Sequence, residues 1–511
     1  MSKINSKYLI TGKLLARNTI LNFIGQVLPL IVAVITLPFI IRGLGTERFG
    51  LLSLAWVVLG YFTIFDLGLG RATTKFIAEA LGKGEPDQVS SLVWTAVVIQ
   101  MILSSLGVLV LINITPFLVE RILNIPPELT GEARNIFYLL AVAIPLILIT
   151  SSFSGVLEAA QRFDLLNAVR VPSSISTYLL TLIGLALGFQ LTGIVVLILI
   201  ARFGTLLALI ILAMRIFPKI RKFSLHFVLF PRLFTYGVWI MVSNVVSPIL
   251  MYLDRFLIAS LLSVAAVAYY TVPYEALTRL WIIPGSLIMS LFPAFSALGR
   301  IEHQQRIEAL FARSIKYTLL ILGPIILVLA LFSEDILTIW VGADFAIQST
   351  VIMQILAFGV LINSIANIPY ALLQGVGRPD IIAKFHLLEL PLYMGTAWFL
   401  INRWGITGAA AAWTIRVLLD AILLFAAAFR IGRFSQRLFI TDGSLLGSLA
   451  LILFGLLTYG LKILTNVLPL FIQVGFLAIL FTVFGWVVWR NVLDNLDRDT
   501  ILKAIKLHKA V

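Results

Sequence analysis

The feature of this sequence that most constrains its fold is a series of apolar blocks, each about 20 residues long. An α-helix rises 1.5 Å per residue, so a block of this length crosses a hydrocarbon core of roughly 30 Å. The blocks lack the strict alternation that marks the strands of a membrane barrel. Because 60% of the residues are hydrophobic and only 12% are charged, a water-soluble fold is excluded. The sequence therefore predicts an all-α polytopic membrane protein.

The blocks and the breaks between them predict fourteen transmembrane helices. They lie near residues 18–41, 48–80, 90–114, 134–158, 165–188, 193–216, 233–259, 264–297, 313–333, 346–373, 381–401, 406–430, 443–461 and 467–489. With this count, 28 of the 38 Lys and Arg fall on the side of the N-terminus and six on the other side. Cytoplasmic loops carry the excess of positive charge, so both termini are predicted in the cytoplasm. The net charge of +14 is thereby attributed to topology and not to a nucleic-acid partner.

An internal repeat of six spans divides the chain. Residues 191–216 align with 406–431 at a shift of 215, and earlier pairs align at nearby shifts: Pro29 with Pro248, Arg162 with Arg378, and Asp164 with Asp380. Six is an even number, so both copies enter the membrane in the same orientation and are related by an axis along the membrane normal. We predict an N-terminal lobe (1–217), a basic cytoplasmic linker (218–232), a C-terminal lobe (233–431), and two extra helices with a cytoplasmic tail (432–511).

Ionisable residues inside the spans are the first candidates for function, because each costs on the order of 2.5–3.5 kcal/mol to insert and usually faces a bundle interior or a watery cavity. They are Asp66 and Arg71 in the second span, Arg202 in the sixth, Asp254 and Arg255 in the seventh, Glu275 and Arg279 in the eighth, Glu389 in the eleventh, and Arg416 and Asp420 in the twelfth.

Two of these pairs have a spacing of four residues, which places both members on one helix face. For Arg416 with Asp420 we favour a structural ion pair. For Glu275 with Arg279, and for Arg255 and Arg202, both a structural role and a role in a cavity remain open. Prolines interrupt several spans, and the repeat partners Pro29 and Pro248 are the best hinge candidates, with simple kinks as the alternative.

Several chemistries are absent from the sequence. There is no cysteine, the four histidines have no metal-ligand spacing, and no GxxxxGK[ST] motif is present. The sequence therefore predicts no metal site, no cofactor and no ATPase of its own.

Two stretches, NFIGQVLPLIVAVITLPFIIRGLGTERFGLLSLAWVV and FDLGLGRATTKFIAEALGKGE, resemble the opening of the polysaccharide biosynthesis proteins, the Wzx-type flippases of the multidrug/oligosaccharidyl-lipid/polysaccharide exporter superfamily. RFDLLNAVR and the TG-initiated sixth and twelfth spans are also typical of them. The resemblance implies V-shaped lobes around a central cavity, lined mainly by the first, second, seventh and eighth spans. It also implies transport of a polyprenyl-linked saccharide across the plasma membrane by alternating access.

The substrate implied by this resemblance carries a pyrophosphate, and Arg binds phosphate bidentately while staying charged. The expected pyrophosphate ligands are Arg255 and Arg279, with Arg71 at the entrance and Arg202 as a weaker candidate. The side chains expected to hydrogen-bond the sugar are those of Asn22, Gln26 and Asn244. If transport is coupled to H⁺ or Na⁺, the candidate carriers are Glu275, Asp254 and Asp66.

Two other functions compete with this hypothesis. A multidrug cation antiporter of the same superfamily would need an acidic cavity, and the first span contains no acid. A membrane polysaccharide polymerase or glycosyltransferase would show a large outer loop with catalytic residues, whereas the longest outward loop predicted here has about twenty residues. We therefore expect a transporter and not an enzyme, working as a monomer.

Overall fold

The computed structural model describes residues 12–62, 69–225, 249–285, 295, 304–432, 434, 444–465, 468–495, 497 and 498. The chain divides into two compact units, Met1–Thr271 and Val272–Val511. Each unit is described by itself, and in the described part of both the regular structure is helical.

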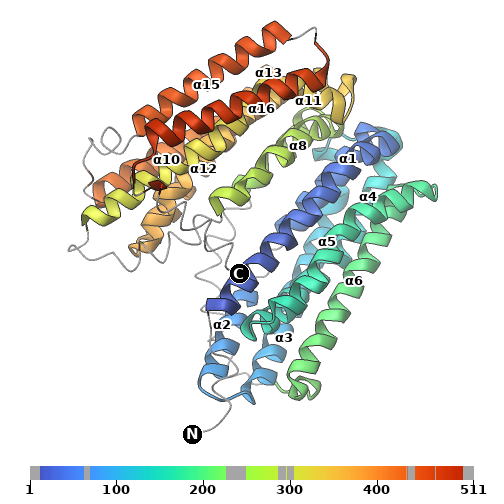
Figure 1. Cartoon of the computed structure of the whole chain (residues 1–511). Coiled ribbons are helices and arrows are strands. Elements are labelled where there is room, and N and C mark those ends of the chain that lie inside the picture. Colours follow the sequence, from blue (N-terminus) through green and yellow to red (C-terminus); the bar gives the residue numbers. More distant parts are fainter. Residues whose placement is uncertain are drawn as a thin grey trace. The chain divides into compact units, whose positions relative to one another are not determined.

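The first unit is a bundle of long helices (Figure 1). They are α1 (Gly12–Phe62), α2 (Leu69–Gly82), α3 (Gln88–Phe117), the π-helical turn η2 (Leu118–Ile122), α4 (Pro127–Ala159), α5 (Phe163–Ala186), α6 (Leu191–Ile216), the 3₁₀ turn η3 (Pro218–Arg221), helical residues 249–261, and the first half of α8 (Val264–Thr278). A break at Gly45, with φ of 76° and ψ of 165°, divides α1. Glycine adopts this positive φ without steric cost, so α1 holds the first predicted span and the start of the second.

The second unit repeats this pattern of long helices. It contains the end of α8, η4 (Arg279–Trp281), α10 (Gln304–Leu331), α11 (Ser333–Trp340), α12 (Ala343–Gly375), α13 (Pro379–Gly432), α15 (Ser444–Thr465), α16 (Leu470–Val487) and η6 (Val488–Val492). A break at Gly405, with φ of 58°, turns α13 into a helical hairpin. A Cβ on Gly408 would lie 2.0 Å from the carbonyl oxygen of Leu400, so only glycine permits this close turn.

The prediction of an all-α polytopic membrane protein is confirmed. All fourteen predicted spans contain helix in the described residues. Ten described helices are long and apolar enough to cross a membrane. This number is lower because α1 holds the first span and the start of the second, because α13 holds two spans, and because the seventh and eighth spans continue into residues that are not described. The division between units falls inside α8, and the lobe boundaries inferred from the repeat remain a prediction.

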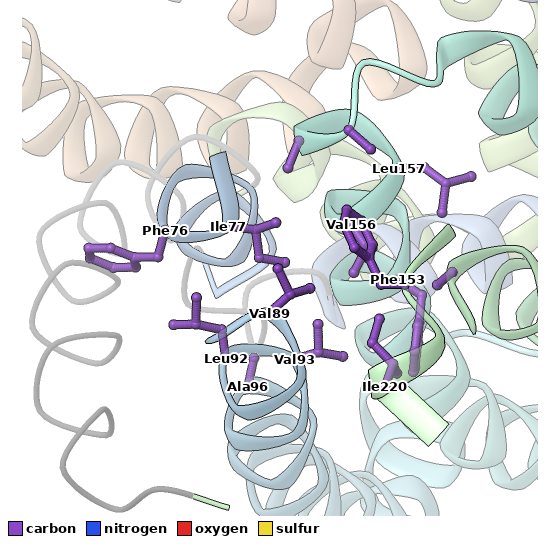
Figure 2. Close-up of a cluster of buried hydrophobic side chains, with 14 of the residues drawn as sticks. Phe76, Ile77, Val89, Leu92, Val93, Ala96, Phe153, Val156, Leu157 and Ile220 are labelled. Atoms are coloured by element: carbon purple, nitrogen blue, oxygen red, sulfur yellow. The ribbon is translucent and has the colours of Figure 1, made fainter. Parts of the chain in front are cut away.

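A buried cluster joins α2, α3, α4 and η3 at one end of the first unit (Figure 2). Figure 2 shows Ile77 of α2, Val93 of α3 and Val156 of α4 meeting in this cluster. Gly155 lets α4 approach α2, because a Cβ there would lie 2.7 Å from Thr74 Oγ1. Small residues at such contacts are the usual means by which membrane helices pack closely.

The start of the predicted linker is attached to this end of the first unit. Trp94 Nε1 on α3 donates to the carbonyl oxygen of Ile220 at 2.9 Å, and Ser90 Oγ donates to that of Lys222 at 2.9 Å. The ring of Trp94 also lies 5.2 Å from that of Phe223. Residues up to Phe223 therefore belong structurally to the first unit.

In the second unit, α12 packs along the α13 hairpin. A Cβ on Gly359 of α12 would lie 2.4 Å from the ring of Trp413, so this glycine admits the indole between the helices. The last two helices, α15 and α16, pack against each other, and α15 packs against α10 (Figure 1).

Candidate functional site

A buried polar cluster lies in the first unit, where helical residues 249–261 pack near α8. Asp254 is fully buried and accepts hydrogen bonds from the Tyr270 hydroxyl and from the backbone N–H of Arg255. Arg255 is 1% exposed; its guanidinium donates to the carbonyl oxygen of Met251 at 3.3 Å and lies 5.3 Å from the ring centroid of Tyr252. The structure thus brings two sequence candidates, Asp254 and Arg255, into one buried site.

The burial of Arg255 has a consequence for anion binding. A guanidinium removed from water is stabilised by hydrogen bonds and by aromatic faces, and both contacts are present here. In this structure a phosphate can reach Arg255 only if the surrounding helices separate.

A second candidate pair lies in the second unit at the end of α8. Arg279 Nη2 donates to Glu275 Oε2 at 3.0 Å, and the two side chains are 44% and 40% exposed. The helix tightens to the 3₁₀ turn η4 at Arg279, and Tyr274 is stacked edge-on against Trp281 and Trp413. The residue before Glu275 is thus packed between two tryptophan rings.

The remaining candidates are dispersed. Arg202 is half-buried on α6, and its Nε is buried without a hydrogen-bond partner among the described residues. Gln26 is exposed on α1, and α1 stays helical through Pro29. Asp66, Asn244 and Pro248 lie outside the described residues, as do the side chains of Asn22 and Arg71.

The structure adds a residue to the predicted ion pair of α13. Arg416 Nη1 lies 3.6 Å from Glu389 Oε2 on the opposite arm of the hairpin, and among the described residues this is the ion-pair contact that Arg416 makes. Glu389 was recognised as a buried acid but received no role from the sequence. Its position opposite Arg416 depends on the turn at Gly405, which no spacing in the sequence reveals.

Sequence comparison shows to which family this helical membrane protein belongs. Residues 15–299 match the family described as "Polysaccharide biosynthesis protein". The chain is 30% identical over 410 residues to a Shigella flexneri protein named "Putative O-antigen transporter", and the match covers 80% of this chain and 96% of the relative. The chain belongs to the polysaccharide biosynthesis protein family.

Solved structures show which fold this polysaccharide biosynthesis protein has. The lipid II flippase MurJ in an inward closed conformation aligns with a TM-score of 0.67 and 16% identity, covering 94% of this chain and all of that one. An inward-facing multidrug resistance MATE family transporter of the MOP superfamily aligns with a TM-score of 0.69 and 18% identity, covering 80% and 95%. The fold is thus common to flippases and drug transporters, and only the sequence relationship separates them.

Proposed function

We propose that this chain is a flippase that moves a polyprenyl-pyrophosphate-linked oligosaccharide across the plasma membrane by alternating access. The observation that carries the proposal is the 30% identity with the O-antigen transporter named above, which extends over 96% of that relative. The family match supports it, since the family is named for polysaccharide biosynthesis. That relative is named as a transporter, and this chain is accordingly a transporter and not an enzyme.

The pyrophosphate of such a substrate needs cationic ligands that stay charged in a region of low dielectric constant. Arg279 fits this role because its side chain is exposed and it already binds a carboxylate, whose geometry resembles that of a phosphate. Arg255, Arg71 and Arg202 are the further candidates.

The contact between Glu275 and Arg279 also suggests how an ion could be coupled to the substrate. Glu275 is the first candidate carrier, because an ion bound at its carboxylate would compete with Arg279 and leave the guanidinium for the pyrophosphate. Asp254 and Asp66 are the other candidate carriers.

The side chain of Gln26 is exposed, as hydrogen bonding to a saccharide requires, and Asn22 and Asn244 are the other candidates for this role. The chain would act as a monomer in the plasma membrane with both termini in the cytoplasm.

The experiment is a flipping assay in proteoliposomes with a fluorescent polyprenyl-pyrophosphate oligosaccharide. Arg279→Ala should slow flipping by on the order of 10- to 100-fold, because a charge-assisted hydrogen bond contributes about 1.5–3 kcal/mol. Arg279→Lys should retain an intermediate rate. Arg403→Ala, which removes an arginine stacked on Phe399, is the matched control and should flip normally.

The same vesicles test the antiporter hypothesis. A flippase should move the lipid-linked saccharide and leave a fluorescent organic cation outside, even with a proton gradient imposed. Gradient-driven uptake of the organic cation, without flipping of the saccharide, would replace the proposed function by multidrug antiport.

A further inference from the structure

The interior of the α13 hairpin contains more acid than its one arginine can neutralise. Glu389 lies on the first arm, and Arg416 and Asp420 lie one turn apart on the second arm. Glu389 interacts electrostatically with both Asp420 and Arg416. Two carboxyl groups therefore meet one guanidinium.

Three carboxylate oxygens of these two acids are buried without a hydrogen-bond partner among the described residues. Glu389 is fully buried, and neither of its carboxylate oxygens has a hydrogen-bond partner among the described residues. Asp420 is 8% exposed, and its Oδ1 likewise has no hydrogen-bond partner among the described residues. The nearest approach of Arg416 to Glu389, 3.6 Å, is longer than a hydrogen bond. A native structure seldom leaves a buried carboxylate in this state.

The other groups around the cluster do not supply the missing positive charge. His386 lies one turn before Glu389 and interacts with Asp420 and Arg416. The helix packed against the hairpin, α12, carries no ionisable Asp, Glu, Lys, Arg or His after Asp344. From α8, Tyr274 reaches Trp413, while Glu275 and Arg279 bind each other. With a neutral histidine, the cluster has a net charge of −1.

We propose that Glu389 and Asp420 share one proton, which makes the α13 hairpin a proton-binding site. A single proton brings the charge of the cluster to zero. It also lets one carboxyl donate a hydrogen bond to the other, which satisfies an oxygen that the structure leaves without a partner. Two carboxyls in close contact cannot both ionise in a region of low dielectric constant, and sharing a proton is the usual outcome.

The ligand is a proton and not a metal ion. The described residues contain no group of three or more His, Asp or Glu side chains placed to hold a metal. Arg416 lies within the cluster, and its positive charge would repel a second cation. The ring of Tyr393, 5.5 Å from the guanidinium, holds that charge in place.

The site is tested by infrared difference spectroscopy of the full-length protein in lipid at neutral pH. The wild-type protein should show the stretch of a protonated carboxyl group in a region without water. Glu389→Gln and Asp420→Asn should each remove that band. Asp380→Asn is the matched control, since Asp380 lies on the same helix but is exposed and bound to Arg378, and it should leave the band in place.

Three results would overturn the proposal. The first is a wild-type spectrum without such a band, which would mean that His386 carries the positive charge and both carboxyls are ionised. The second is loss of the band on addition of Na⁺ at constant pH, which would make this a sodium site. The third is a band that survives both substitutions.

A second measurement covers the case in which a variant fails to fold. Proton binding by the folded state alone makes stability fall as pH rises, so thermal stability of the wild-type protein should decrease as the band disappears in an alkaline titration. If the infrared band and the thermal stability changed at different pH values, this result would contradict the proposed proton site. None of these measurements involves a saccharide, so they test the proton site independently of the flippase proposal.

Discussion

Arg162 and Asp164 form a two-point ion pair at the start of α5, with Nε–Oδ1 and Nη2–Oδ2 distances of 2.9 and 3.0 Å. Arg378 and Asp380 form the same pair at the start of α13, with distances of 2.9 and 3.2 Å. These are the residues that the internal repeat aligns. The same ion pair thus lies at the corresponding helix start in each unit.

In the turns before these two ion pairs the residue that precedes the arginine has a positive φ in both copies but a different side chain, and this difference yields a prediction. Gln161 has φ of 56° and Gly377 has φ of 78°, and each precedes the arginine of its pair. A left-handed conformation costs a non-glycine residue roughly 1–2 kcal/mol. Gln161→Gly should therefore raise stability by about 1 kcal/mol, after the entropy that glycine loses on folding is subtracted.

The measurement is the midpoint of thermal unfolding in detergent, followed by tryptophan fluorescence. Gly377→Gln is the reciprocal variant and should lower the midpoint. Equal midpoints for wild type and Gln161→Gly would show that the hydrogen bonds of the turn, and not its backbone conformation, determine its stability.

Residues that depend on local pattern were predictable from the sequence. The fourteen helical spans follow from block length, and the repeat alignment pairs Arg162 with Arg378 and Asp164 with Asp380 from the sequence alone. The breaks at Gly45 and Gly405 fall in the gaps between predicted spans. Apolar length and the conformational freedom of glycine act within a few residues, which is why one sequence suffices to predict them.

Contacts that depend on packing between helices were not predictable. Spacing of four residues suggested that Arg416 pairs with Asp420, yet the arginine approaches Glu389 across the hairpin. For Arg255 the sequence left a structural role and a cavity role open, and the tertiary structure buries both Arg255 and Asp254. Such outcomes are determined by which helix lies alongside, and a single sequence carries no information on that.

Close packing in the first unit gives a prediction at Gly50. A Cβ at this position would lie 1.8 Å from the carbonyl oxygen of Val264, which is backbone and cannot rotate away. Gly50→Ala should therefore force α1 and the start of α8 apart and lower stability by about 1–3 kcal/mol, the usual cost of overpacking. The thermal midpoint should fall accordingly.

Gly131→Ala is the control for Gly50→Ala. Gly131 lies in α4, and a Cβ there meets no atom within 4 Å. Alanine is favoured over glycine in a helix by up to about 1 kcal/mol, so this variant should be neutral or slightly stabilised. If both alanine variants unfold at the wild-type temperature, α1 and α8 are not in the tight contact described.

Buried charges attach the segment after α16 to α10 in the second unit, and they give a prediction that depends on pH. Asp497 is fully buried and accepts hydrogen bonds from Lys316 Nζ at 2.7 Å and from the Tyr317 hydroxyl. Burial alone would raise the pKa of Asp497, but hydrogen bonds from Lys316, Tyr317 and the backbone N–H of Asp494 lower it below its usual value.

Removing the Asp497 carboxylate leaves the ammonium group of Lys316 buried and uncompensated. Asp497→Ala should therefore lower stability by about 3–5 kcal/mol, whereas the double variant Lys316→Met with Asp497→Leu should recover much of it, because no buried charge remains. Limited proteolysis after Val487 gives the local readout, and cleavage should accelerate in the single variant only.

The pH dependence has a defined sign. A carboxyl whose pKa is lowered by folding stabilises the protein above its unfolded pKa, about 3.9, and loses this contribution as pH falls below that value. Acidification should thus destabilise the wild-type protein more than the double variant, with the difference opening below about pH 4. Parallel stability curves for the two proteins would show that Asp497 has the same proton affinity in both states and that the buried pair does not hold the C-terminal segment on α10.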